Sequence, residues 1–294
     1  MEELVAPVDP RSSWDLPPFG GLEVVEVLDE VATRVLAPNP SPMTLDGTNT
    51  YVLSVAGTGE ALVIDPGPDD PEHLARVRDV LTSRDAAVRA VVVTHHHVDH
   101  AEAAAGWARS FACPVVAADR AVAGPDGDVV ADGDAVDLAG LEVRVVATPG
   151  HTRDHVALRL GTGAVLTGDH VLGRGTSVVA YPDGDLAAYL DSLRRVLALG
   201  PEVLYPGHGP ALTEDPTAVL GYYRDHREFR QRQILAALAE GPATPAELVA
   251  RIYAEVDRSL WSAAEASTRA ALEVLVGTGQ LEWLGPDRIG LAAP

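Results

Sequence analysis

The stretch from Val91 to His100 reads VVVTHHHVDH, an apolar β-branched run that ends in four histidines and one carboxylate. The alanine-rich segment 101–105 follows at once and favours a helix. This pattern predicts a strand, a tight loop and the start of a helix, with the polar cluster in the loop. Since alternate residues of an extended chain point the same way, we expect His95 and His97 to face one side together. Imidazole and carboxylate groups at this density suit a divalent cation, above all zinc.

Three further candidate ligands each follow an apolar run that breaks at or beside a glycine. They are His151 after 145–150, Asp169 after 164–168 and His208 after 203–207. Strand ends that bring such side chains to one rim predict a metal site. A solvated histidine-rich turn, the alternative for 91–100 alone, does not explain them.

The order of these motifs resembles a known family. His-x-His-x-Asp-His, then a lone His, then Gly-Asp, then Pro-Gly-His-Gly is similar to the signature of the metallo-β-lactamase superfamily. Segments 42–51, 148–155 and 168–173 resemble the β-lactamase-like protein 2 group within it, and the likeness covers residues 30 to 285. The resemblance implies an α/β fold, the αββα sandwich, with a winged-helix-like domain at the C-terminus.

The resemblance also implies a dinuclear zinc site with a hydroxide between the two metals. Its seven ligands, carried over by motif position, are His95, His97 and His151 for one zinc, Asp99, His100 and His208 for the other, and Asp169 as the bridge. Asp99 is the candidate catalytic residue that handles the proton, and Asn49 and His170 are candidate substrate contacts. Asp65 either supports the metal loop from behind or is a turn-forming residue before proline. The di-iron branch of the fold has Glu at the position of His97, so the motif favours hydrolysis over oxygen chemistry.

The composition restricts the kinds of molecule that the protein is expected to bind. The net charge is −21, and all 22 basic residues are arginine. This balance argues against a general nucleic-acid surface or an anionic-membrane surface, because both need clustered positive charge. The single cysteine, Cys113, precludes an internal disulfide, and we expect a buried structural thiol. The acidic start Met1-Glu2-Glu3 does not resemble a signal peptide, and no apolar run approaches a membrane span, so we expect a cytoplasmic protein.

Composition and predicted secondary structure divide the chain into three parts. Residues 1–21 are rich in proline and glycine and predict an arm that lies on the surface or is disordered. Residues 22–215 alternate strands and helices and predict the catalytic domain. Residues 216–294 predict three helices and a hairpin, the winged-helix pattern, with eight arginines against ten acidic residues. This balance predicts a structural cap rather than binding of duplex DNA. His73 and His226 lie on predicted helices, where we expect them to be solvated.

We therefore predict a two-zinc hydrolase that acts on a small acyl ester or thioester. The alternative within the enzyme class is a single-strand endoribonuclease, an activity of the β-lactamase-like protein 2 group. The low aromatic content of 5% and the lack of an arginine cluster beyond Arg194 and Arg195 argue against an RNA channel. A third hypothesis is a non-catalytic metal-dependent regulator, which would need no bridging carboxylate. The sequence leaves the oligomeric state open.

Overall fold

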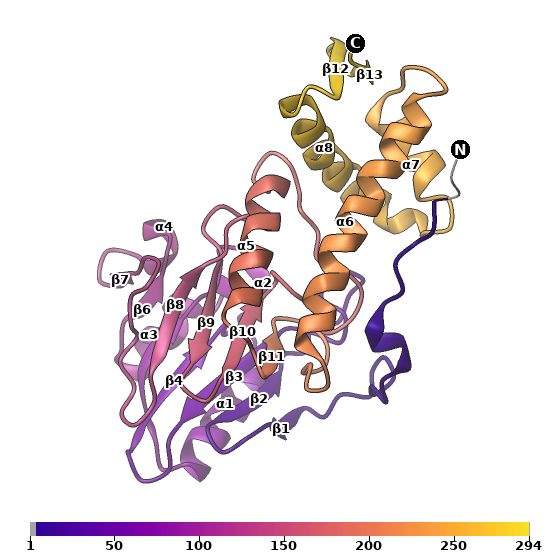
Figure 1. Ribbon diagram of the computed structural model, residues 1–294. Coiled ribbons are helices and arrows are strands. Elements are labelled where there is room, and N and C mark those ends of the chain that lie inside the picture. The colour runs from indigo at the N-terminus through magenta and orange to yellow at the C-terminus, as the bar shows by residue number, and fades with distance from the viewer. Residues whose placement is uncertain (1–3, 294) are drawn as a thin grey trace.

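The computed structural model describes residues 4–293. In this part of the chain two large β-sheets stack face to face, with helices on their outer sides (Figure 1). The first sheet holds seven strands in chain order: β1 (Val25–Val27), β2 (Ala32–Leu36), β3 (Asn49–Ser54), β4 (Glu60–Ile64), β5 (Ala87–Val92), β6 (Val115–Ala117) and β7 (Asp128–Val129). The second holds four, in the order β11 (Val203–Pro206), β10 (Ala164–Gly168), β9 (Val156–Leu160) and β8 (Val143–Ala147).

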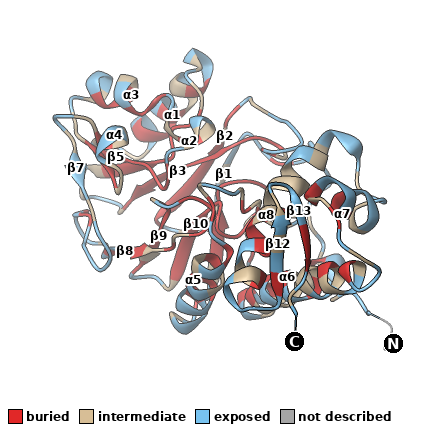
Figure 2. Cartoon of the chain, turned by 90° about the horizontal axis from the view of Figure 1, so that it is seen from above, coloured by how far each residue is buried: buried red, intermediate tan, exposed pale blue. Residues whose placement is uncertain are grey.

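Apolar side chains fill the space between the two sheets. Leu53 and Leu62 of the first sheet and Leu158 and Leu166 of the second have no more than 1% of their surface exposed. Burial of this kind is the main favourable term in folding. Figure 2 shows the same distribution, since the strands are drawn largely as buried and the outer faces of the helices as exposed.

Helices cover both outer faces and complete the αββα sandwich that the sequence predicts. Against the first sheet lie α1 (Pro71–Ser83) and α3 (Ala104–Phe111), with the short α2 (Val98–Ala101) and α4 (Arg120–Ala123) at its ends. Against the second sheet lie α5 (Leu186–Ala198) and the first half of α6 (Pro216–Leu238). The alanine-rich segment 101–105, expected to be helical, contains a break: α2 ends at Ala101 and α3 begins at Ala104, and Asp99 and His100 lie inside α2.

Strand direction brings the candidate ligands together. β5 runs parallel to β4, and β10 runs parallel to β11. β8 and β10 both run antiparallel to β9, so they share one direction. The carboxyl ends of β5, β8, β10 and β11 therefore deliver the loops that carry the four ligand motifs to one end of the sandwich.

The C-terminal part confirms the predicted winged-helix pattern. It contains α6, α7 (Pro245–Ile252), η2 (Arg258–Leu260), α8 (Trp261–Gly277) and a hairpin of β12 (Leu281–Gly285) and β13 (Arg288–Leu291) (Figure 1). Val219 and Leu220 of α6 belong to the same apolar core as Leu193 of α5 and Leu272 of α8. Because this core is continuous across position 216, the division into 22–215 and 216–294 stays a prediction.

Two sequence predictions for histidines were wrong. His73 has no exposed surface: its Nε2 lies 2.8 Å from Thr50 Oγ1 and its ring lies 5.4 Å from the ring of Trp107. It faces the sheet on the same side of α1 as Val77, and the first turn of that helix is covered by α3. His226 is half-buried. Cys113 is half-buried too, where we expected burial.

The N-terminal arm is attached to the body of the protein through its short helix. Its short helix η1 (Pro10–Ser13) contacts α6, and Arg11 is 5% exposed. The Arg11 guanidinium donates to the carbonyls of Leu172 at 2.7 Å and Gly175 at 2.6 Å. The arm therefore supports the loop that follows Asp169, while residues 1–3 of the predicted arm lie outside the described part.

Candidate metal centre

The loop after β5 is held by Asp65, which follows β4. One carboxylate oxygen of Asp65 accepts from the Thr94 backbone N–H at 2.8 Å, and the other accepts from Thr94 Oγ1 at 2.8 Å and from His100 Nδ1 at 2.9 Å. Asp65 is 2% exposed and has φ = 49°, in the left-handed region that non-glycine residues rarely adopt. These contacts agree with the first of the two roles considered for Asp65, support of the loop from behind.

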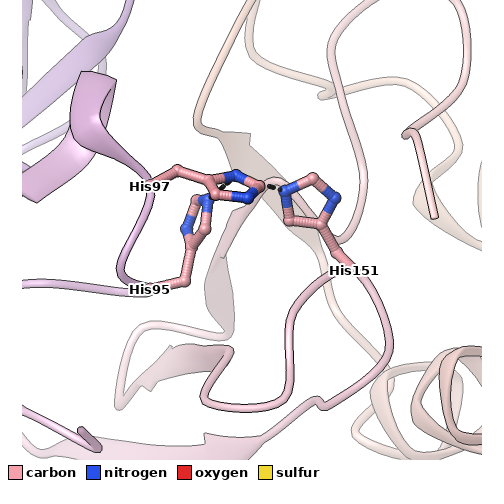
Figure 3. A group of neighbouring side chains, drawn as sticks. All are labelled: His95, His97 and His151. Atoms are coloured by element: carbon pink, nitrogen blue, oxygen red, sulfur yellow. Dashed lines mark hydrogen bonds between the residues drawn. The ribbon is translucent and has the colours of Figure 1, made fainter. Parts of the chain in front are cut away.

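The first cluster consists of His95, His97 and His151, whose side chains converge from two loops (Figure 3). His97 Nδ1 lies 3.1 Å from His95 Nε2 and 3.0 Å from His151 Nε2. His151 donates its Nδ1–H to the Val178 carbonyl at 2.6 Å, and His95 Nδ1 lies 3.0 Å from the Thr94 hydroxyl. With these protons directed backward, the Nε2 lone pairs of His95 and His151 face the centre of the cluster.

The second cluster consists of Asp99, His100 and His208. His208 Nε2 lies 3.2 Å from both Asp99 Oδ2 and His100 Nε2. His208 donates its Nδ1–H to the Gly47 carbonyl at 3.1 Å, and His100 donates its Nδ1–H to Asp65. Both rings again present Nε2 to the centre.

Asp169 lies between the two clusters. Its carboxylate is 3.3 Å from His100 Nε2, 3.4 Å from His208 Nε2 and 3.7 Å from His151 Nε2. Its Oδ1 is buried without a hydrogen-bond partner in the described structure. Gly207 makes room for this carboxylate, because a Cβ there would stand 2.5 Å from Asp169 Oδ1.

Two residues outside the predicted ligand set fix the backbone of Asp169. His155 is 1% exposed; its Nδ1 lies 2.8 Å from Thr148 Oγ1, and its Nε2 accepts from the Asp169 N–H at 3.1 Å. The Ser177 hydroxyl donates to the Asp169 carbonyl. Ser177 lies in an irregular segment, where the sequence gave no signal for it.

The histidines of the two clusters differ in their pKa values. Burial, followed by the neighbouring charge of His151, lowers the pKa of His97 to about 4, and burial also lowers the pKa values of His95 and His151. These imidazoles are neutral at pH 7, the form that binds a metal ion. For His208 burial also lowers the pKa, but Asp169 and Asp99 outweigh it and raise the value to about 9.

The carboxylates of the centre remain ionised. Burial would raise the pKa of Asp169, but His208 and His100 outweigh it and bring the value well below the usual range. Burial also opposes ionisation of Asp99, and its hydrogen bond to His208 lowers its pKa overall. Without an ion, protons on histidine therefore balance these carboxylates, and a bound cation would take the place of those protons.

His96 and the two predicted substrate contacts, Asn49 and His170, lie behind or beside the centre. His96 is partly exposed; its Nδ1 lies 2.7 Å from Asp154 Oδ1, which ties the two histidine loops together. Asn49 has no exposed surface and donates from Nδ2 to the carbonyls of Pro206 and Gly209, both at 2.8 Å. His170 is also fully buried, with its ring 4.7 Å from that of Tyr189. Substrate contact by Asn49 and His170 stays a prediction, and in this structure both side chains lie within the protein.

A cavity of about 390 Å³ adjoins the centre. Its walls come from the loop before β3, the segment after β10, and helices α6 and α8 with their connection. Val178 lines it, and the carbonyl of the same residue accepts from His151 Nδ1, so the cavity lies next to the residue that holds this ligand from behind. Leu172, Val256 and Leu260 give it apolar walls.

Comparison with known proteins gives consistent matches. Residues 43–208 match the family described as "Metallo-beta-lactamase superfamily", and residues 244–281 match the "Beta-lactamase associated winged helix domain". The chain is 35% identical to the "Beta-lactamase-like protein 2 homolog" of Drosophila melanogaster, over 88% of this chain and 92% of that protein. It is 36% identical to the "Atrochrysone carboxyl ACP thioesterase" of Aspergillus fumigatus, over 83% and 78%. A crystal structure of a metallo-beta-lactamase family protein from Thermus thermophilus superposes with a TM-score of 0.76 at 25% identity, over 90% of this chain and all of that one.

Proposed function

The chain belongs to the metallo-beta-lactamase superfamily, and on that premise we propose that it is a two-zinc hydrolase of acyl esters or thioesters. The hydrolase class comes from the family, and the His/Asp cluster provides for a divalent metal. We propose three points beyond the family: that the metal is zinc, that two ions bind per chain, and that the substrate is an acyl ester or thioester.

The donor set carries the metal part of the proposal. Three nitrogen atoms face one another in the first cluster at 3.0 and 3.1 Å, a spacing that needs either a proton on His97 Nδ1 or a cation among them. His95, His97 and His151 would hold one zinc, Asp99, His100 and His208 the other, and Asp169 would contact both. When bound, zinc supplies a water of lowered pKa and a Lewis acid for the carbonyl oxygen.

The chain's own side chains then manage orientation and the proton. Asp65, Gly47 and Val178 accept the Nδ1–H groups of three histidines, which keeps Nε2 free in each ring. Asp99 is ionised and its side chain is 25% exposed. With Oδ2 facing the second cluster, the other carboxylate oxygen would be the one to accept a proton from the attacking water. As the water oxygen bonds to the acyl carbon and the C–S or C–O bond breaks, that proton passes to the leaving thiolate or alkoxide.

An acyl substrate is supported by one observation above others: the relative in Aspergillus fumigatus carries the name of a carboxyl ACP thioesterase. The apolar walls of the cavity beside His151 suit an acyl chain. The charge of −21 disfavours a polyanion. Endoribonuclease activity remains the second candidate, because the match to the β-lactamase-like protein 2 homolog spans 92% of that protein.

A direct assay decides between these two activities. The zinc-loaded protein and its Asp99→Ala variant are compared on acyl thioesters, lactones and single-stranded RNA. We expect multiple turnovers on at least one acyl substrate and a loss of roughly 100-fold or more in the variant, the scale of a general acid–base contribution. RNA cleavage that Asp99→Ala abolishes, with no acyl substrate turned over, would establish the ribonuclease instead.

The metal content is tested separately. Elemental analysis of the purified protein at saturating zinc should give two ions per chain, and Asp169→Ala should lower both occupancy and turnover. His96→Ala is the matched control, because His96 lies between the ligands in sequence but bonds to Asp154. One metal per chain together with an unaffected Asp169→Ala variant would contradict the two-metal assignment.

A further inference from the structure

The cavity beside His151 is lined by three arginines that come from two separate parts of the chain. Arg174 comes from the segment after β10, and Arg227 and Arg230 come from neighbouring turns of α6. The sequence prediction that no such cluster exists was therefore wrong, because the chain brings these residues together only when α6 packs against the second sheet.

None of the three arginines has a close carboxylate partner within residues 4–293. The nearest is Asp46 Oδ2, at 4.0 Å from Arg174 Nε. Arg227 is 7% exposed, donates to the Ser177 carbonyl and lies with its guanidinium 5.1 Å from the centre of the Tyr189 ring. Arg230 donates to the Ile252 carbonyl at 3.3 Å and to Gln233.

Several guanidinium donors of these cavity-lining arginines have no acceptor. The Nε atoms of Arg174, Arg227 and Arg230, and Nη2 of Arg174, are buried without a hydrogen-bond partner in the described structure. Buried cationic donors without an acceptor are costly, and the usual remedy is a carboxylate or a phosphate. His226, which also lines the cavity, adds no charge at pH 7, because burial and then Arg227 and Arg230 lower its pKa to about 3.

We propose that Arg174, Arg227 and Arg230 bind an anionic group, a carboxylate or a phosphate, of the acyl substrate. This inference rests on the proposed acyl hydrolase and specifies its substrate as an apolar chain with a negative group. The apolar walls at Leu172 and Leu260 take the chain, and the arginines take the anion. A cavity of about 390 Å³ holds one small molecule rather than a run of nucleotides.

The two sources of the anion are a carboxylate on the acyl side and a phosphate on the thiol side. Three thioesters separate them: hexanoyl-N-acetylcysteamine is neutral, adipoyl-N-acetylcysteamine has a free carboxylate, and hexanoyl-phosphopantetheine has a phosphate. The readout is the ratio of kcat/KM for each charged thioester to that for the neutral one. In the wild type we expect one of the two ratios to exceed one clearly, which identifies the source.

The test variants are Arg174→Gln, Arg230→Gln and the double variant, all in the full-length zinc-loaded protein. Arg227 is left intact, because it supports the Ser177 carbonyl beside the metal centre. The favoured ratio should fall about 10-fold to 100-fold in the double variant, the scale of a charge-assisted hydrogen bond. Arg224→Gln is the matched control, since Arg224 lies on the same helix but is exposed and paired with Asp225.

Calorimetry with adipate and phosphopantetheine separates this inference from the proposed function. Binding of one of these ligands to the wild type, weakened in the double variant and not in Arg224→Gln, supports the anion site even if no thioester is hydrolysed. Equal losses on neutral and charged thioesters in both single variants would show a structural role only and overturn the inference. Competition by single-stranded RNA alone, with neither small anion bound, would overturn it as well.

Discussion

Asp65→Asn is the change that most directly tests how the metal centre is held. Asp65 binds no metal in the proposed ligand set, yet its carboxylate accepts three hydrogen bonds, two from Thr94 and one from His100 Nδ1. Asparagine has almost the same shape, so the packing of this 2% exposed side chain is preserved. The substitution therefore keeps the packing and removes one negative charge and the acceptor for His100 Nδ1.

The magnitude follows from the contacts. The amide oxygen can still accept from the Thr94 N–H, but an NH₂ group then meets His100 Nδ1–H, so two donors face each other. Either that hydrogen bond is lost, which costs about 1.5–3 kcal/mol for a charge-assisted bond, or the His100 proton moves to Nε2, the atom that faces Asp169. Both outcomes weaken metal binding, and we expect a loss of roughly 10-fold to 100-fold in affinity.

The assay is competition for zinc with a chromophoric chelator, using full-length wild type, Asp65→Asn and a control. The control is Asp70→Asn, which makes the same chemical change at the N-cap of α1, where Asp70 accepts from the His73 N–H. Asparagine caps helices about as well as aspartate, so this variant should match the wild type. A zinc affinity of Asp65→Asn within about twofold of the wild type, well short of the loss expected for a supporting residue, would refute the argument.

Three other outcomes are expected. Gly207→Ala should lower zinc occupancy, measured by elemental analysis, because its Cβ would stand 2.5 Å from Asp169 Oδ1; full occupancy would contradict this. His73 has a pKa lowered to about 4, chiefly by burial, so its contribution to stability is present above its unfolded pKa of about 6.5 and is lost as the pH falls through 4. His73→Gln should therefore flatten the fall in Tm between pH 7 and pH 4, and an unchanged slope would contradict the assignment. Full-length protein should not shift duplex DNA in a gel assay; salt-sensitive, sequence-selective binding at micromolar concentration would disprove the predicted cap role of 216–294.

Much of the fold could be predicted from the sequence because its signals are local. The apolar runs 61–64 and 203–205 are followed by Asp65-Pro66-Gly67 and Pro206-Gly207, and they predict strand ends directly. The positions of the clustered ligands also followed, since a polar residue directly after an apolar strand must lie at the sheet edge. The structure places six of the seven predicted ligands in two adjoining clusters of three, and the seventh, Asp169, lies between them.

The features that the sequence did not predict correctly are decided by packing between distant parts of the chain. His73 occupies the first turn of an amphipathic helix, where the sequence alone cannot show that Trp107 of another helix covers it. The break between α2 and α3 was hidden because the alanines of 101–105 favour helix throughout. Long-range packing, rather than any local pattern, decides both.

The C-terminal helices illustrate the same dependence on packing, with a consequence for function. In a DNA-binding winged helix, the recognition helix presents free basic side chains to the groove. Here Arg269 of α8 is paired with Glu265 at 3.0 Å and Asp287 at 2.8 Å. The residues of α8 that line the cavity are small, Ala263, Ala264 and Ser267. Helix α8 therefore contributes small side chains to the wall of the cavity beside His151, and its arginine is neutralised by two carboxylates. This arrangement agrees with the predicted cap and leaves no free cation at Arg269 to bind a phosphate backbone.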